Sequence, residues 1–103
     1  MWQTVERRFA DDHPTAAGHF PGNPIIPGAV LLDEVMACIG AAECDGVVTR
    51  IRSAKFLRSV RPGQAICVRW RPLPDGAIGF ECRMKEDDVL AVTGALVIAP
   101  VQA

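Results

Sequence analysis

The chain of 103 residues is poor in the features that mark several protein classes. It has no tyrosine, two tryptophans, two histidines and a formal net charge of −1. Without an excess of charge of one sign, the composition provides no bulk attraction toward nucleic acid. Half of the residues are hydrophobic, which excludes a largely disordered chain.

Long apolar runs and metal-binding patterns are also missing. No run approaches the roughly 18 residues of a membrane span, and the first residues, MWQTVERRF, lack the apolar core of a signal peptide. The sequence therefore predicts a cytoplasmic protein that does not bind membranes. The four cysteines form no C-x-x-C pair and have no histidine at metal-ligand spacing, so we expect free thiols and no metal site.

The length suits one hydrophobic core, and no repeat or linker divides the chain, so residues 1–103 are predicted to form a single domain. Residues 10–27 are rich in proline and glycine, which predicts a loop. From residue 28 or 29 to about residue 42 the sequence AVLLDEVMACIGAA predicts a helix. This helix is apolar nearly all round, so we expect it to be buried on most sides.

Strand-like segments account for most of the remaining sequence. Weak alternation over residues 3–9 suggests a first strand, and the clusters RPG, PDG and EDD separate the later ones. Four consecutive strands joined by short turns predict antiparallel neighbours. We expect an α+β fold whose sheet curls around the helix, with enough apolar surface left over to favour a homo-oligomer. The four later strands are predicted at residues 47–56, 65–71, 77–85 and 90–98.

Candidate chemistry is concentrated in GHFPGNPIIPGAVLLDEV, residues 18–35. His19 lies in a loop stiffened by prolines, and an imidazole titrates near pH ~6.5, which suits a general base. The alternative interpretation is a histidine that only caps a turn. The other histidine, His13, is interpreted as a turn residue.

Asp33 lies inside the apolar helix, where an ionised carboxylate is costly unless it is paired, hydrogen-bonded or protonated. Ala29 and Ala37, one turn away on either side, leave room beside it. Glu34 lies about 100° further round the helix, so we expect only one of the two acids to point into that space. The alternative interpretation is that one or both acids mark an exposed stripe of the helix.

Gly28 follows Pro27 at the predicted start of the helix. The first amides of a helix have no acceptor within the helix and lie at the positive end of its dipole. Because Gly28 has no side chain, a ligand oxygen can approach these donors. This pattern predicts an oxyanion-type site.

Two blocks of the sequence resemble one family. HFPGNPIIPG, residues 19–28, with a carboxylate fourteen residues after the histidine, resembles the bacterial 3-hydroxyacyl-acyl carrier protein dehydratases. KFLRSVRPGQ, residues 55–64, resembles the KFRRPVxPGD segment of the same family. The resemblance implies a hot-dog fold, in which an antiparallel sheet wraps around one central buried helix.

The resemblance also implies a reaction and its residues. His19 would remove the proton next to the thioester carbonyl, Asp33 would help the 3-hydroxyl leave as water, and the Gly28 amide would polarise the carbonyl. The histidine of one subunit would face the acid of its neighbour, so at least a homodimer is implied. The substrate would be carried on the phosphopantetheine of acyl carrier protein, with no metal or other cofactor, in fatty-acid or specialised lipid or polyene biosynthesis. The side chains expected to bind the acyl group are Phe20, Pro27, Leu32, Met36 and Phe56.

One position departs from the family pattern. Members commonly have a glutamine four residues after the acid, and this chain has Ala37 there. The chain is also shorter before the histidine than the housekeeping enzymes, which suggests a compact member. Two alternatives therefore stay open: an acyl thioesterase of the same fold, and a carrier-binding or heterodimer-forming subunit without activity.

A basic run without any acid spans residues 50–71. Such a run suits binding of an acidic carrier protein, and a solvated face is an equal alternative. RNA binding is disfavoured, because few aromatic residues lie among the basic ones. Alternation predicts that Arg69 and Arg71 share one face of a strand, as do two arginines of the preceding strand. The residues expected to bind the carrier are Arg50, Arg52, Lys55, Arg58 and Arg61.

Overall fold

The computed structural model describes residues 2–10, 25–42 and 46–100 of the chain. All the predicted elements are present, with bounds within two residues of those expected. In chain order they are β1 (Gln3–Arg8), α2 (Gly28–Ala42), β2 (Gly46–Phe56), β3 (Ala65–Pro72), β4 (Ile78–Met84) and β5 (Leu90–Pro100). The α+β class predicted from the sequence is confirmed.

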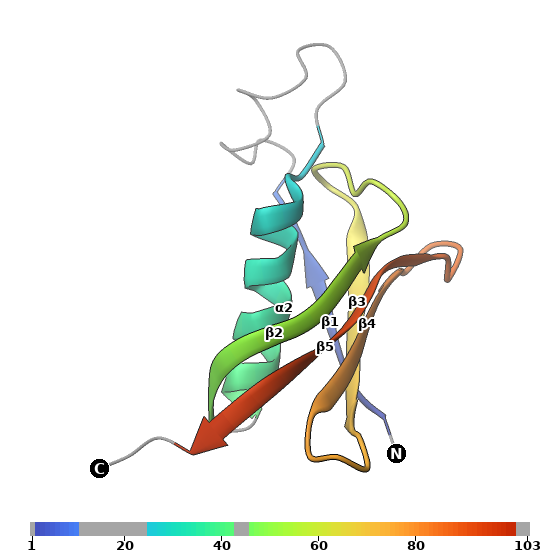
Figure 1. The fold of residues 1–103 in the computed structure, drawn as a ribbon. Helices are drawn as coiled ribbons and strands as arrows, with labels where there is room; N and C mark the ends of the chain where they lie inside the picture. Colours follow the sequence, from blue (N-terminus) through green and yellow to red (C-terminus); the bar gives the residue numbers. More distant parts are fainter. Residues whose placement is uncertain (1, 11–24, 43–45, 101–103) are drawn as a thin grey trace.

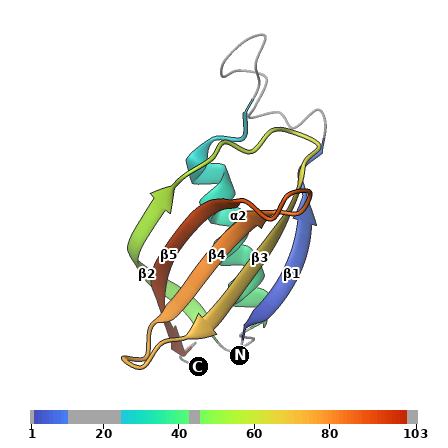
Figure 2. The ribbon, with the colours of Figure 1, turned by 90° about the vertical axis from the view of Figure 1, so that its right-hand side faces the viewer.

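The strands form one sheet in the order β1-β3-β4-β5-β2, and every neighbouring pair is antiparallel (Figure 2). The antiparallel prediction is therefore confirmed. The prediction that the four later strands are neighbours in sequence order is wrong for β2 and β3. Residues 57–64 do not form a hairpin but cross the end of the sheet, so β2 pairs with β5 at the edge opposite β1 (Figure 2).

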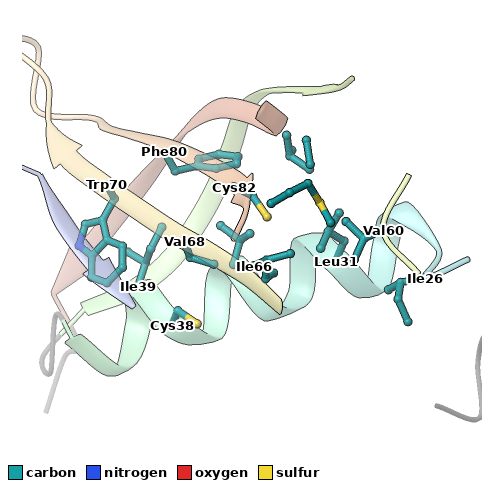
Figure 3. Close-up of a cluster of buried hydrophobic side chains, with 14 of the residues drawn as sticks. Ile26, Leu31, Cys38, Ile39, Val60, Ile66, Val68, Trp70, Phe80 and Cys82 are labelled. Atoms are coloured by element: carbon teal, nitrogen blue, oxygen red, sulfur yellow. The ribbon is translucent and has the colours of Figure 1, made fainter. Parts of the chain in front are cut away.

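The core lies between α2 and one face of this sheet (Figure 1). Leu31, Val35 and Ile39 recur along one side of the helix, and all three are buried. They pack into a single cluster with alternate residues of β3 and β4, which point to the same face of the sheet (Figure 3). The buried residues of those two strands are Ile66, Val68, Trp70, Phe80, Cys82 and Met84.

The helix is buried on one side only. Leu32 and Met36 are half-buried, and Ala29, Asp33 and Ala37 are exposed. The sheet curls around this side of the helix as predicted. The expectation that the helix is buried on most sides is not met by the described residues, because a single layer of five strands covers one face of a helix. The expected homo-oligomer stays a prediction, and the uncovered stripe gives it a physical basis.

Main-chain hydrogen bonds gather the start of α2, the end of β1 and the 57–64 connection at one end of the sheet. Ile26 N donates to Val60 O (2.7 Å), and Gly63 N donates to Phe9 O (2.9 Å). Pro27 O accepts from Leu31 N (3.0 Å), which begins the helix. The residues that the sequence singles out from Gly28 onward therefore lie at an anchored end of the fold.

Cys38, Cys67 and Cys82 are free thiols, as predicted, and Cys44 lies outside the described residues. Cys82 is fully buried, and this burial raises the pKa of its thiol to about 12. Among the described residues, no helix combines the length and the apolarity that crossing a membrane requires.

Gly94 of β5 provides a test of this packing. A Cβ atom at this position would overlap the carbonyl oxygen of Ser53 in β2 and lie 2.8 Å from Cζ of Phe80. We expect Gly94→Ala to lower the free energy of unfolding by about 2 kcal/mol, because the sheet must shift to accept the methyl group. Urea denaturation measures this change.

Gly40 of α2 is the matched control, since nothing lies within 4 Å of a Cβ atom built there. Gly40→Ala should raise the free energy of unfolding by about 0.5–1 kcal/mol, the usual gain for alanine over glycine inside a helix. A Gly94→Ala variant as stable as the parent would contradict the described packing of β2 on β5.

Candidate active site

Two pockets flank the first turns of α2. The first, of about 390 Å³, is called the Gly28 pocket, and the second, of about 450 Å³, is called the Asp33 pocket. The Gly28 pocket is lined by Ile25, Ile26, Gly28, Leu31, Phe56, Leu57, Arg58, Ser59 and Val60. The Asp33 pocket is lined by Arg7, Arg8, Phe9, Ala10, Val30, Asp33, Glu34 and Ala37.

The Gly28 pocket combines an apolar wall with a backbone donor. Gly28 is the first residue of α2, and no described residue accepts a hydrogen bond from its amide. A Cβ atom at position 28 would lie 3.1 Å from Cε1 of Phe56, so a side chain there would press on the ring. Phe56 is itself 49% exposed and forms part of the wall. The pocket can therefore accept a ligand oxygen at the positive end of the helix dipole.

The residues predicted to bind the acyl group do not all come together. Phe56 lines the Gly28 pocket, whereas Leu32 and Met36 pack against the core and line neither pocket. Pro27 is half-buried at the start of α2 and also lines neither pocket. Phe20, like the predicted base His19, lies outside the described residues.

Asp33 lies on the uncovered stripe of α2 and lines the pocket named after it. Ala37, one turn further on, lines the same pocket, so no amide at position 37 holds the carboxyl group. No hydrogen bond or ion pair joins Asp33 to another described residue. Its side chain is exposed, so the described residues do not supply the apolar setting expected for it.

Glu34 also lines the Asp33 pocket, although the sequence predicts that only one of the two acids points there. Its Oε1 atom lies 3.1 Å from Nε of Arg7 and accepts a weak hydrogen bond from Sγ of Cys38 (3.9 Å). Burial, more than these charges, raises the pKa of the Cys38 thiol. Glu34 therefore ties α2 to β1, which brings the carboxylate to the pocket wall.

The β1 side of this pocket was not predicted. Arg7, Arg8, Phe9 and Ala10 line it from the end of β1. The sequence does contain one indication that Arg7 points toward the helix side of the sheet. The alternation over residues 3–9 places Arg7 on the same face as Phe9, and Phe9 is buried in the core. The sequence alone did not indicate that α2 lies under this strand.

Gly28 and Asp33 do not face the same space. They are separated by five positions in α2, which corresponds to about 140° around a helix. Each lines its own pocket. Among the described residues, neither pocket therefore contains both the Gly28 amide and the Asp33 carboxyl group.

The predicted carrier-binding residues divide into paired and unpaired cations. Arg52 lies 2.6 Å from Asp75, and Arg58 lies 2.7 Å from Asp87. The basic run contains no acid, and the turns after β3 and β4 supply these two. Within the described part of the chain, no ion pair is found for Arg50, Lys55 and Arg61.

The basic run also divides in space. The guanidinium carbons of Arg69 and Arg71 lie 4.2 and 4.6 Å from the ring centre of Trp2, which confirms that the two arginines share a face of β3. β4 and β5 separate them from the arginines of β2. Register shifts in β2 interrupt the alternation that was expected to place Arg50 and Arg52 on one face.

Comparison with known proteins agrees with the predicted resemblance. The family model described as ApeI-like, ApeI dehydratase, matches residues 3–95. The chain is 32% identical over 102 residues to the 3-hydroxyacyl-[acyl-carrier-protein] dehydratase FabZ of Anaplasma phagocytophilum (strain HZ), covering 85% of this chain and 69% of the relative. It is 42% identical over 64 residues to FabZ of Alkaliphilus metalliredigens (strain QYMF), covering 53% of this chain and 43% of that relative, less than half of its length.

A solved structure has the same fold. The dehydratase heterocomplex ApeI:P from Xenorhabdus doucetiae superimposes with a TM-score of 0.79 and 18% identity, covering 95% of this chain and 87% of the other. The predicted hot-dog fold is thereby confirmed. Because the family model spans nearly the whole described sheet and helix, the chain belongs to the ApeI-like dehydratase family.

Proposed function

We propose that this protein dehydrates a 3-hydroxyacyl group, carried on acyl carrier protein, to the trans-2-enoyl thioester. The observation that carries the proposal is the placement of Gly28 and Asp33 on two sides of one helix, each in its own pocket. Family membership and the names of the FabZ relatives support the reaction and the carrier.

In the proposed reaction three groups act on one substrate. The imidazole of His19 removes the proton from the carbon next to the thioester carbonyl, and the Gly28 amide donates a hydrogen bond to the carbonyl oxygen as negative charge develops there. The carboxyl group of Asp33 gives a proton to the 3-hydroxyl group. The C–O bond then breaks, water leaves and the C=C bond forms. This sequence of steps needs no redox cofactor.

We further propose that two chains build each site. Because Gly28 and Asp33 line different pockets, the substrate held at Gly28 of one chain would meet Asp33 of its neighbour. The small side chains of Ala29 and Ala37 leave room on the uncovered stripe of α2 for that approach. A homodimer is the simplest arrangement, and the heterocomplex named for the solved relative makes a second type of chain the alternative.

The proposed partner is an acidic carrier protein. Lys55, Arg58 and Arg61 lie at the end of the sheet where the Gly28 pocket opens, so they suit docking of an acidic surface there. Arg50 and Arg52 lie nearer the middle of β2, and Arg52 is paired with Asp75, so these two are less suited to that role. The cytoplasmic location stays a prediction.

Substitution of the base and the acid tests the reaction. His19→Ala and Asp33→Asn should each lower kcat by about 10²- to 10⁴-fold, the usual contribution of a general base or acid. The assay follows conversion of a 3-hydroxyacyl thioester to the enoyl thioester by mass spectrometry. Release of free thiol in place of enoyl product would identify a thioesterase.

Glu6→Gln is the matched control for a carboxyl-to-amide change. Glu6 pairs with Lys85 on the face of the sheet that α2 does not cover, and it lines neither pocket. The control should keep the parental kcat. If wild-type protein binds carrier but turns over no substrate, the inactive-subunit alternative is correct.

Mixed dimers test the shared site. When His19→Ala and Asp33→Asn chains are refolded or coexpressed together, each mixed dimer keeps one intact site of its two, so isolated mixed dimers should have about half of wild-type activity. Activity is measured on mixed dimers isolated with two affinity tags. Mixed dimers that form and remain inactive would mean that base and acid belong to the same chain.

A further inference from the structure

Two arginine–aspartate pairs in the structure have nearly the same geometry. Oδ2 of Asp87 lies 2.7 Å from Nη1 of Arg58, and Oδ2 of Asp75 lies 2.6 Å from Nη1 of Arg52. In each aspartate the other oxygen accepts from the amide two residues later, Val89 or Ala77, at 3.2 Å. In each pair the hydrogen bond from the arginine lowers the pKa of the aspartate. Both pairs are therefore fully ionised near neutral pH.

The two pairs differ in their place in the fold. Arg58 lines the Gly28 pocket, whereas Arg52 lines neither pocket. Asp87 lies in the turn after β4, and Asp75 lies in the turn after β3, which is at the opposite end of the sheet (Figure 1). Only the Arg58–Asp87 pair is therefore placed to act on a ligand of the Gly28 pocket.

The main chain at Arg58 does not depend on its ion pair. The amides of Leu57 and Arg58 both donate to Ala91 O, at 2.7 and 3.3 Å. The turn that carries Asp87 is also held by its own bonds, since Asp88 N donates to Met84 O (2.9 Å). The side-chain pair can therefore open without unfolding either segment.

The pair is exposed enough for an anion to displace Asp87. The two side chains are 39% and 43% exposed, and ion pairs in such positions contribute little to stability. Guanidinium groups bind phosphate as well as carboxylate. A ligand phosphate that reaches the pocket can thus take the place of the Asp87 carboxylate.

We propose that Asp87 competes with the anionic end of the substrate for binding to Arg58. Asp87 is paired with Arg58 until the phosphate of the pantetheine arm replaces it. This inference rests on the proposed function, because it assigns that phosphate to Arg58. Asp87 weakens binding of phosphate-bearing acyl groups at the Gly28 pocket and thereby favours release of the product. Thioesters without a phosphate are indifferent to it.

Asp87→Asn tests the inference, with Asp75→Asn as its matched control. Asparagine keeps an oxygen that can accept from the amide two residues later, so both turns should hold, and melting temperatures check this. KM is measured for the same 3-hydroxyacyl group on holo-acyl carrier protein, on coenzyme A and on N-acetylcysteamine, which has no phosphate.

We expect Asp87→Asn to lower KM for the carrier-linked and coenzyme A substrates by about two- to fivefold, the range expected for freeing an exposed ion pair. KM for the N-acetylcysteamine substrate and all values for Asp75→Asn should equal those of the parent. An unchanged or higher KM in Asp87→Asn would overturn the inference. An effect confined to the carrier-linked substrate would overturn the assignment of phosphate, because acidic side chains of the carrier would then be the ligand of Arg58.

Failure of the proposed function gives a different result. If the wild-type protein turns over none of the three substrates, binding of coenzyme A is measured by calorimetry for the parent and both variants. Tighter binding to Asp87→Asn alone would support the competitor role although the proposed reaction fails. Equal binding to all three proteins would overturn it.

Discussion

The packing of α2 against a single layer of strands is the constraint on which the rest of the molecule depends. Leu31, Val35 and Ile39 are buried on one side of the helix, and the described residues form no second layer over its other side. The helix is nevertheless apolar on nearly all sides, so half-buried Leu32 and Met36 remain near the surface. A fold of this kind gains stability when another chain covers the open side. The carboxyl group of Asp33 lies on that side, so the proposed dimer would link assembly to the proposed chemistry.

The start of α2 lines two pockets. Its first residue, Gly28, lines one pocket, and Asp33, five positions later, lines the other. Hydrogen bonds from Ile26 and Gly63 hold the surrounding segments, so both groups occupy an anchored end of the fold. Precise placement of donors and acids on rigid elements is what catalysis by preorganised groups requires.

Acidic residues from other parts of the sequence neutralise some of the positive charge near the Gly28 pocket. The 50–71 segment contains only basic charges, yet Asp75 and Asp87 pair with two of its arginines. The stacking of Arg69 and Arg71 on Trp2 forms a second basic group on the face of the sheet away from α2. The surface thus carries two separate groups of basic side chains, and acidic side chains lie beside some of them. This arrangement favours specific contacts over a general attraction of polyanions.

The sequence by itself determined the six elements and the family, because proline, glycine and acidic clusters bound segments of clear helical or strand character, and because the blocks at residues 19–28 and 55–64 are specific. Only the tertiary structure decided the neighbours of β2, since residues 57–64 are compatible with either a hairpin or a crossover. It alone brought Arg7 to Glu34 and Asp87 to Arg58, pairs separated by 27 and 29 positions in the chain. Such contacts depend on which faces of the whole sheet must be buried together, and no local pattern carries that information.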